Sequence, residues 1–409
     1  MIPTLQLLLC SVLVFSLGMY LLIAIVFTYG GRRMLRLDAP SEPGFRVDPA
    51  APGVTILKPC CGHDDDLDGC LESYYRLNYP NFQLILGVRS KDDAAFPIIC
   101  EVARRHPERR TDIVTEAGRS MNLKIANFET MLPLARHDLI MLSDSNTMTH
   151  PDMLASMVEE LHQPGVAEVV APVVGIGERS PGSFFDNLSI NSSLWMGTLS
   201  IYVIMKRVAG LGKTVLLRRT DLDAVGLAAM GRSFGDDEVL VSGLTALGKK
   251  VVFGRRLVGS VSRDAAMRRS ITRHLRWLQI RWTMAPLPSS IYESIMSPMI
   301  PVIVLLLAYP TMQHLAWFAE VTFFQIVVDV YAFSRMRGEL PPVSRFLMLA
   351  TRPVINFVLW FYAAIDRRVT WRGRTFWMGS GATILQAPPD GLGVVTPTEV
   401  QPVLPTHRD

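Results

Sequence analysis

The sequence predicts an α/β domain with a mostly parallel sheet, placed between membrane segments. Between residues 54 and 173, short apolar runs alternate with stretches of helical character. This alternation is typical of a parallel sheet with helices on its faces. Residues 7–29 and 291–333 are almost free of charge and long enough to cross a bilayer. Hydrophobic residues make up 49% of the 409 residues, and the mean hydropathy of +0.26 is high for a water-soluble protein.

Residues 1–31 form an apolar segment that we interpret as a membrane anchor. They carry no charged residue, and Arg32, Arg33 and Arg36 follow directly. A cleaved signal peptide is excluded because there is no basic region at the start, the apolar run is too long and no small-residue cleavage site follows. The positive-inside rule then places the N-terminus outside and the next domain in the cytosol. Residues 32–53, rich in Pro and Gly, are expected to be a linker.

The domain at residues 54–285 is expected to consist of alternating strands and helices, ending in a basic helix. We expect strands at residues 54–58, 82–88, 139–143 and 166–173, and helices at 67–77, 94–105, 124–134 and 151–161. Residues 183–205 are mostly uncharged but interrupted by Asn and Ser. We expect them to form a helix at the membrane face or along an acceptor cleft.

The strand at residues 139–143 ends in Asp144 and Asn146. Open α/β sheets bind ligands beyond the carboxyl ends of their strands. Two oxygen ligands at alternate positions can hold Mg²⁺ or Mn²⁺ on a nucleotide diphosphate. The alternative is an ordinary turn, since Asp, Ser and Asn are common turn residues.

Asp92 and Asp93 follow the strand at residues 82–88 in a similar way. One interpretation is that they converge with Asp144 on a bound nucleotide. The other, which residue types alone favour, is that they cap the helix that begins at Ala94.

Asp236 and Asp237 open an apolar-periodic segment that ends at Gly248. Acidic residues are common in the first turn of a helix. The functional interpretation is that one of the two carboxylates acts as a general base. Burial that raises the pKa of a carboxyl group towards neutrality would allow it to take a proton from a sugar acceptor.

The stretch 268–282 is the most basic part of the chain. On a helix, Arg269, Arg273 and Arg276 share one face. Arginine side chains match diphosphate oxygens in bidentate fashion. Alternatively, this stretch is a basic, aromatic helix at the membrane surface, and such a helix could also bind a diphosphate.

Membrane segments are expected again at residues 286–366. Pro310 divides residues 291–333 into two spans that form a hairpin. Residues 346–365 are apolar but contain Arg352 and Pro353, which favours an interfacial or re-entrant segment. Residues 367–409 are expected to be a basic stretch and then a disordered tail, beginning after Ala387.

Several other functions are excluded. A net charge of +4 is too small to indicate a nucleic-acid partner. The five cysteines lack the paired spacing of a zinc site, and we interpret them as free thiols in a reducing compartment. Gly212-Lys213-Thr214 does not complete a phosphate-binding loop, because Arg207 stands where that motif needs glycine.

The candidate motifs occur in a particular order. Asp92-Asp93-Ala94-Ala95 is followed by Asp144-Ser145-Asn146, then by Asp236-Asp237, and last by Arg273-His274-Leu275-Arg276-Trp277. Leu57-Lys58-Pro59 precedes the first motif, and Asn122-Leu123-Lys124 precedes the second. This order resembles that of the ceramide glucosyltransferases and their bacterial relatives, glycosyltransferase family 21. These are metal-dependent enzymes with a GT-A fold. Asp236 and Asn146 differ from the Glu and Asp that are usual at those positions.

The resemblance implies a role for each motif residue. Asp237, with Asp236, would deprotonate the acceptor. The donor would be bound by Lys58, Asp92, Asp93, Lys124 and Asp144. Asp144 and Asn146 would hold Mg²⁺ or Mn²⁺. The leaving group and acceptor would be steadied by Arg273, Arg276 and Trp277.

The expected protein is therefore a membrane-bound inverting glycosyltransferase that moves a hexose from a UDP-sugar to a lipid hydroxyl. UDP-glucose and ceramide are the first choice of substrates. The alternative is a hopanoid glycosyltransferase that uses UDP-N-acetylglucosamine, and a non-catalytic membrane scaffold is a weaker one. We expect an integral membrane protein of a bacterial inner membrane, with its catalytic domain in the cytosol.

Overall fold

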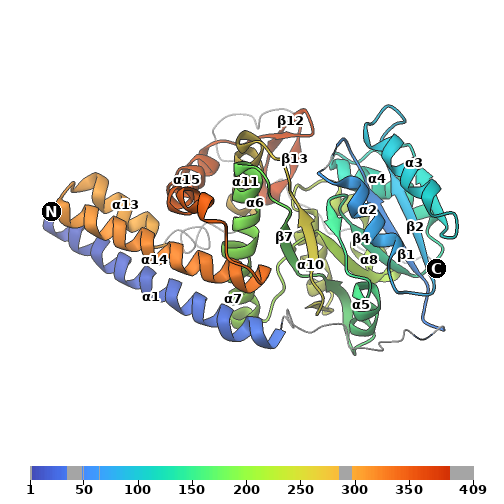
Figure 1. Cartoon of the computed structure of the whole chain (residues 1–409), viewed down its shortest axis with the longest axis horizontal. Helices are drawn as coiled ribbons and strands as arrows, with labels where there is room; N and C mark the ends of the chain where they lie inside the picture. Colours follow the sequence, from blue (N-terminus) through green and yellow to red (C-terminus); the bar gives the residue numbers. More distant parts are fainter. Residues whose placement is uncertain (1, 35–47, 49, 64, 285–296, 387–409) are drawn as a thin grey trace, which may run out of the picture.

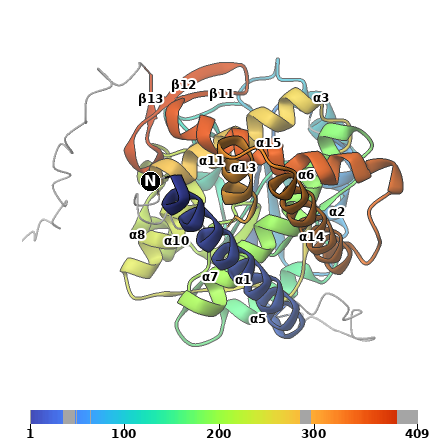
Figure 2. The same ribbon diagram turned by 90° about the vertical axis from the view of Figure 1, so that its left-hand side faces the viewer.

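The computed structural model describes residues 2–34, 48, 50–63, 65–284 and 297–386. An α/β domain lies beside a group of long apolar helices (Figure 1). Figure 2 views the molecule from the side of these helices, with α1 in front. The overall division expected from the sequence is therefore present.

Seven strands form the main sheet, in the order β3-β2-β1-β4-β8-β6-β9. Only β8 runs antiparallel to its neighbours, β4 and β6, and the other pairs are parallel. The carboxyl ends of β1, β2 and β4 therefore meet at one edge of the sheet. The strands are β1 (Val54–Pro59), β2 (Phe82–Gly87), β3 (Thr111–Val114), β4 (Leu139–Ser143), β6 (Val166–Val170), β8 (Thr214–Arg218) and β9 (Lys250–Phe253).

Helices cover both faces of this sheet, with a hydrophobic cluster on each side. Alternate residues of a strand point to opposite faces. Val54 and Ile56 of β1 accordingly belong to one cluster and Leu57 to the other. Because both faces are covered, the central strands β1, β2 and β4 are mostly apolar and buried along their length. The helices are α2 (Leu67–Tyr75), α3 (Ala95–Arg105), α4 (Leu123–Met131), α5 (Met153–Leu161), α8 (Arg219–Val225), α9 (Leu227–Met230) and α10 (Asp236–Ala246).

The strand expected at residues 166–173 is shorter than predicted. β6 ends at Val170, and Val173 begins β7 in a second sheet. Pro172 lies at the break and has no N–H to donate to a strand ladder. The second sheet has the order β5-β10-β7. Its strands are β5 (Thr147–Met148), β7 (Val173–Ile176) and β10 (Val258–Val261).

A continuous helical stretch joins the α/β domain to the apolar helices. It begins at a capping box between Ser180 and Ser183. Its first part packs on α11, its π-helical middle packs on α14, and its end packs on α1. The stretch expected at the membrane face therefore lies at this junction. It consists of α6 (Pro181–Ser189), η2 (Ile190–Leu194) and α7 (Trp195–Met205), and α11 is Met267–Met284.

Within the residues that the structure describes, four helical stretches are long and apolar enough to cross a membrane, judged by length and composition: Thr4–Gly30, Pro181–Met205, Met312–Arg337 and Val343–Ile365. The first lies within α1 (Ile2–Met34) and the third is α14 (Met312–Arg337). α13 (Met299–Ala308) packs against α14, with Pro310 between them, and the crossing of the membrane by both helices stays a prediction. The ten described residues of α13 extend for about 15 Å, less than a bilayer core.

α15 (Phe346–Ile365) is an unbroken helix, although it contains Pro353. Arg352, which we had taken as evidence against an apolar span, is fully buried and forms an ion pair with Asp329 of α14. Both ends of α15 contact the α/β domain. Before its start, Arg345 donates to the carbonyl of Arg179 (2.7 Å). After its end, the carbonyl of Asp366 accepts from Gln279 (2.9 Å). This arrangement favours the interfacial placement.

Residues after α15 form a third sheet, which is a correction to the prediction of a basic tail from residue 367. Its strands are β11 (Arg368–Trp371), β12 (Arg374–Met378) and β13 (Ile384–Leu385). A β-bridge joins Thr383 to Ser233, just before α10. Phe234 packs against Trp371 and Phe376. The segment therefore folds back onto the α/β domain. The tail expected to be disordered after Ala387 lies outside the described residues.

Candidate active site

The loop that carries Asp144 rests on a buried group of hydroxyls. Tyr74 contacts the hydroxyls of Ser143 (2.5 Å) and Thr147 (2.9 Å). Ser143 also contacts Thr214 of β8 (2.9 Å). Buried hydroxyls that are all paired fix the backbone above them. Asp144 therefore leaves β4 at a defined angle.

Lys58 belongs to this support, and its predicted contact with the nucleotide sugar stays a prediction. Its side chain is fully buried. The ammonium donates to the carbonyl of Asp144 (2.5 Å) and to the hydroxyl of Thr147 (2.9 Å), and it lies 4.1 Å from the centre of the Tyr74 ring. Lys58 thus holds the loop from below. A lysine near a strand end could not be assigned to one side of the loop from sequence alone.

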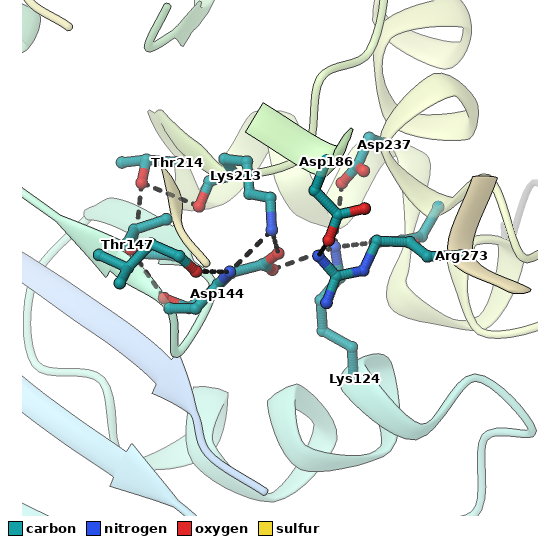
Figure 3. A network of polar contacts seen from close by, with 12 residues as sticks. Lys124, Asp144, Thr147, Asp186, Lys213, Thr214, Asp237 and Arg273 are labelled. Atoms are coloured by element: carbon teal, nitrogen blue, oxygen red, sulfur yellow. Dashed lines mark hydrogen bonds and ion pairs between the residues drawn. The ribbon is translucent and has the colours of Figure 1, made fainter. Parts of the chain in front are cut away.

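Asp144 and Asn146 aim their side-chain oxygens at one point. Figure 3 shows the side chain of Lys213, the residue just before β8, directed at Asp144. Its ammonium lies 3.1 Å from Asp144 Oδ2 and 3.0 Å from Asn146 Oδ1. The Asn146 amide donates to the carbonyl of Val261 (3.0 Å), which fixes its orientation. Burial opposes ionisation of Asp144, but Lys213 and Lys124 outweigh it and lower the pKa of this carboxyl group.

The two converging oxygens fit a hard divalent cation only in part. Mg²⁺ is often bound by one or two protein oxygens together with substrate phosphates. Asp144 and Asn146 match that pattern. Among the described residues, no group of three or more His, Cys, Asp or Glu side chains could hold a metal. A cation at this point would therefore rely on phosphate oxygens and would require Lys213 to move away.

Lys124 connects the start of α4 to the start of α10. Asn122 caps α4 by accepting from the N–H groups of Lys124 and Ile125, which fixes the helix start that carries Lys124. The Lys124 ammonium forms ion pairs with Asp236 and Asp237, the latter at 3.0 Å. Burial opposes its charge, yet the surrounding carboxylates raise the pKa of Lys124 well above its usual range.

Asp236 and Asp237 differ in their surroundings. The Asp236 side chain is buried and accepts from the amide of Asn122 (3.2 Å). Burial, together with the adjacent Asp237, raises the pKa of Asp236 to about 7 despite Lys124. The Asp237 side chain is 30% exposed. It lies against Gly212, where an added Cβ would be 1.5 Å from Asp237 Oδ2. Asp237 is therefore the carboxylate of this pair that a substrate can touch.

Arg273 and Arg276 lie on the same helix, α11, but have different partners. Arg273 pairs with the buried Asp186 of α6 at 2.8 Å. His274 also pairs with Asp186 (3.2 Å). Burial of Asp186 opposes its ionisation, but His274 and Arg273 outweigh it and lower the pKa of Asp186. These contacts fix α11 against α6.

Arg276 makes no ion pair with any residue that the structure describes. Its guanidinium lies 5.6 Å from the ring centre of Trp371, in the cation–π range. Burial and the nearby guanidiniums of Arg273 and Arg372 lower the pKa of Arg276 to about 10. Trp277, expected to touch the leaving group or the acceptor, packs at a tilt against His274 and also contacts the larger core cluster.

Asp93 accepts a hydrogen bond at the start of α3, in line with the helix-capping interpretation of the sequence. Its side chain accepts from the N–H of Ala95 (2.9 Å) and from that of Gly62, after β1 (2.7 Å). Asp92 is exposed. Asp93 therefore joins the loops that follow β1 and β2, and the nucleotide contact stays a prediction.

Three positions in this network were not selected from the sequence. Lys213 belongs to an incomplete phosphate-binding motif, and Asp186 lies in a stretch that the sequence shows as mostly uncharged and of mixed polarity. Arg372 lay in the expected tail. A Trp-Arg-Gly-Arg sequence between two short apolar runs is a hairpin signal that could have indicated a folded segment at residues 371–374.

Comparison with known proteins identifies the family. The model of glycosyl transferase family 21 matches residues 17–384. Ceramide glucosyltransferase 1 of Caenorhabditis elegans is 25% identical over 282 residues, which are 67% of this chain and 58% of that protein. Ceramide glucosyltransferase of Komagataella phaffii is 25% identical over 149 residues, which are 35% of this chain and 29% of that protein. The chain thus spans less than two thirds of the length of these curated relatives.

Solved glycosyltransferase structures are also similar. A mannosyltransferase of Pyrobaculum calidifontis, solved with GDP-mannose and Mn²⁺, is 14% identical with a TM-score of 0.46, covering 87% of this chain and 97% of that one. Glucosyl-3-phosphoglycerate synthase of Mycobacterium tuberculosis is 13% identical with a TM-score of 0.36, covering 55% and 79%.

The family match extends from the first apolar helix to the third sheet, and it includes every motif described above. The mostly parallel sheet between helices is the GT-A domain that the resemblance implied. This chain belongs to glycosyl transferase family 21.

Proposed function

We propose that the chain transfers a hexose, with inversion, from a UDP-sugar to the hydroxyl of a membrane lipid, most specifically glucose to ceramide. The observation that carries this proposal is the position of Asp237. It is an accessible carboxylate 3.0 Å from Lys124 and in one polar network with Asp144. The network therefore contains a group that can accept a proton, beside groups that can hold a diphosphate.

The reaction is a single in-line displacement at the anomeric carbon. Asp237 takes the proton of the acceptor hydroxyl, whose oxygen forms the new bond to that carbon. The bond from the carbon to the diphosphate oxygen breaks, and UDP leaves with the electron pair. Arg276 of α11 stabilises the negative charge that develops on UDP, and Arg273, paired with Asp186, holds that helix in place.

Lys124 holds Asp236 and Asp237 together at the start of α10. Mg²⁺ or Mn²⁺ at Asp144 and Asn146 would neutralise charge on the diphosphate. One protein carboxylate as base is compatible with inversion, because no covalent sugar intermediate is needed.

The choice of a lipid acceptor is supported by the position of the α/β domain beside the apolar helices (Figures 1 and 2). α11, which carries Arg273 and Arg276, packs directly on α15, the apolar helix that we expect at the membrane interface. A lipid hydroxyl at the membrane surface would thus lie close to the cleft. The curated relatives are ceramide glucosyltransferases, which favours UDP-glucose and ceramide.

The test is transfer by the full chain, purified in detergent, with Mg²⁺ or Mn²⁺. UDP-glucose, UDP-galactose and UDP-N-acetylglucosamine are each combined with ceramide and with a hopanoid alcohol, and the product is identified by mass. Glucosylceramide is the expected product. An N-acetylhexosaminyl hopanoid would replace the proposed substrates by the alternative pair. No turnover of any UDP-sugar would overturn the proposed function.

The role of Asp237 is tested in the same assay with Asp237→Asn. We expect kcat to fall by about 10² to 10⁴-fold, the usual range for loss of a general base, while UDP binding is retained. Asp223→Asn is the control, because it removes an equally charged but exposed side chain on α8. Equal activity of the two variants would contradict the assignment of Asp237 as the base.

A further inference from the structure

The hairpin formed by β11 and β12 touches three parts of the candidate active site. Trp371 lies over the guanidinium of Arg276 on α11. Arg372 donates to the carbonyl of Cys61, two residues after β1 (2.9 Å). Phe234, two residues before Asp236, packs against Trp371. The hairpin therefore connects the end of β1, the start of α10 and the basic face of α11.

Positive charge is concentrated beneath this hairpin. Arg273 is neutralised by Asp186, but Arg276 has no carboxylate partner in the part of the chain that the structure describes. The nearby charges of Arg273 and Arg372 contribute to the lowered pKa of Arg276. Guanidiniums that lower the pKa of a neighbour in this way repel one another, and a bound anion would relieve the repulsion. Diphosphate is the anion that the proposed donor brings to this place.

Arg372 also occupies an unfavourable backbone position. Its φ is 49°, and Gly373 follows at 75°, so the two form a tight two-residue turn between paired Trp371 and Arg374. Asn or Gly is the usual first residue of such a turn. The left-handed conformation costs most other residues about 1 kcal/mol. An arginine in such a conformation is consistent with a use for its side chain.

We propose that the β11–β12 hairpin is part of the nucleotide-sugar site and that Arg372 binds the diphosphate of the donor. Trp371 keeps Arg276 directed at the same group. This inference rests on the proposed function, since it assumes a nucleoside diphosphate donor. It adds a binding residue from a segment that follows the membrane helices in the chain.

The experiment measures binding of UDP, UMP and uridine to the full chain in detergent. The variants are Arg372→Gln, Arg372→Lys and Arg374→Gln. Arg374 is the matched control, because it is exposed, equally charged and directly across the turn. Thermal unfolding of each variant establishes that it is folded.

We expect Arg372→Gln to weaken UDP binding by about tenfold or more, the usual effect of losing a hydrogen bond to a charged group. Binding of uridine should be unchanged, and Arg372→Lys should give an intermediate loss. Arg374→Gln should bind UDP within about twofold of the wild type. Equal UDP affinity of Arg372→Gln and Arg374→Gln would overturn the inference. An equal loss for UDP and uridine would also overturn it, since Arg372 would then act through the Cys61 loop.

Failure of the proposed function would look different. In that case the wild-type chain itself would bind no UDP. If the wild-type chain binds UDP and Arg372→Gln binds it equally well, the proposed function stands and only the role of the hairpin is overturned.

Discussion

The raised pKa of Asp236 leads to a prediction about stability. Its carboxyl group has a pKa of about 7 in the folded chain, against 3.8 ordinarily. The difference is about 3 pKa units, and each unit corresponds to about 1.4 kcal/mol, so the ionised group costs folding about 4 kcal/mol. Below pH 4 the group is protonated in both states and costs nothing. Between pH 4 and 7 the cost grows, and above pH 7 it is complete.

Asp236→Asn removes this charge and keeps an oxygen that can accept from Asn122. We therefore expect the variant to be more stable than the wild type, by an amount that grows from pH 5 to 7 and stays constant above. For a domain of this size, about 4 kcal/mol corresponds to a difference in Tm on the order of 10 °C. The assay is thermal unfolding in detergent between pH 5 and 8.5, with the exposed Asp223→Asn as control.

Two results would refute this reasoning. A lower Tm of Asp236→Asn at pH 8 would mean that pairing with Lys124 makes the charge stabilising. A difference in Tm that does not change with pH would mean that Asp236 does not titrate in this range.

Two further predictions concern glycine and the buried ion pair. Gly212→Ala should lower kcat about 100-fold, because the added Cβ would displace Asp237. Gly248→Ala is the control, since Gly248 also has a positive φ but no atom lies within 4 Å of the added Cβ. We expect it to leave turnover unchanged. Turnover of the two variants under saturating donor decides this. Asp329→Asn should destabilise the chain by about 3–5 kcal/mol because it leaves Arg352 buried without its partner, and adding Arg352→Met should restore most of the loss. Tm in detergent is the measure, and a double variant no better than the single one would contradict it.

The parts of the site that follow from local pattern were predictable. Asp144 and Asn146 come directly after an apolar strand, and a strand of a parallel sheet ends at the ligand-binding edge. Asp236 and Asp237 begin a helix, and Arg273 and Arg276 are spaced for one helical face. Each of these predictions depends only on residues that lie within a few positions of one another along the chain.

What could not be predicted depends on contacts between distant residues. Lys213 reaches Asp144 from 69 positions away, and nothing near it in sequence distinguishes it from a surface lysine. Arg352 was interpreted as an interruption of an apolar helix, because its partner Asp329 lies on another helix. The contacts of Lys58 below the Asp144 loop were not predicted, because a sequence does not show which side of a loop a side chain occupies.

The docking of residues 368–385 on the α/β domain has a consequence for how the protein becomes active during synthesis. Ser233 and Phe234, just before the acidic start of α10, obtain their β partners from residues that the ribosome makes after α13, α14 and α15. The α/β domain can therefore emerge and begin to fold, but its cleft stays incomplete until those helices have been made. A chain that stalls or is cut before residue 368 would accumulate as an inactive precursor.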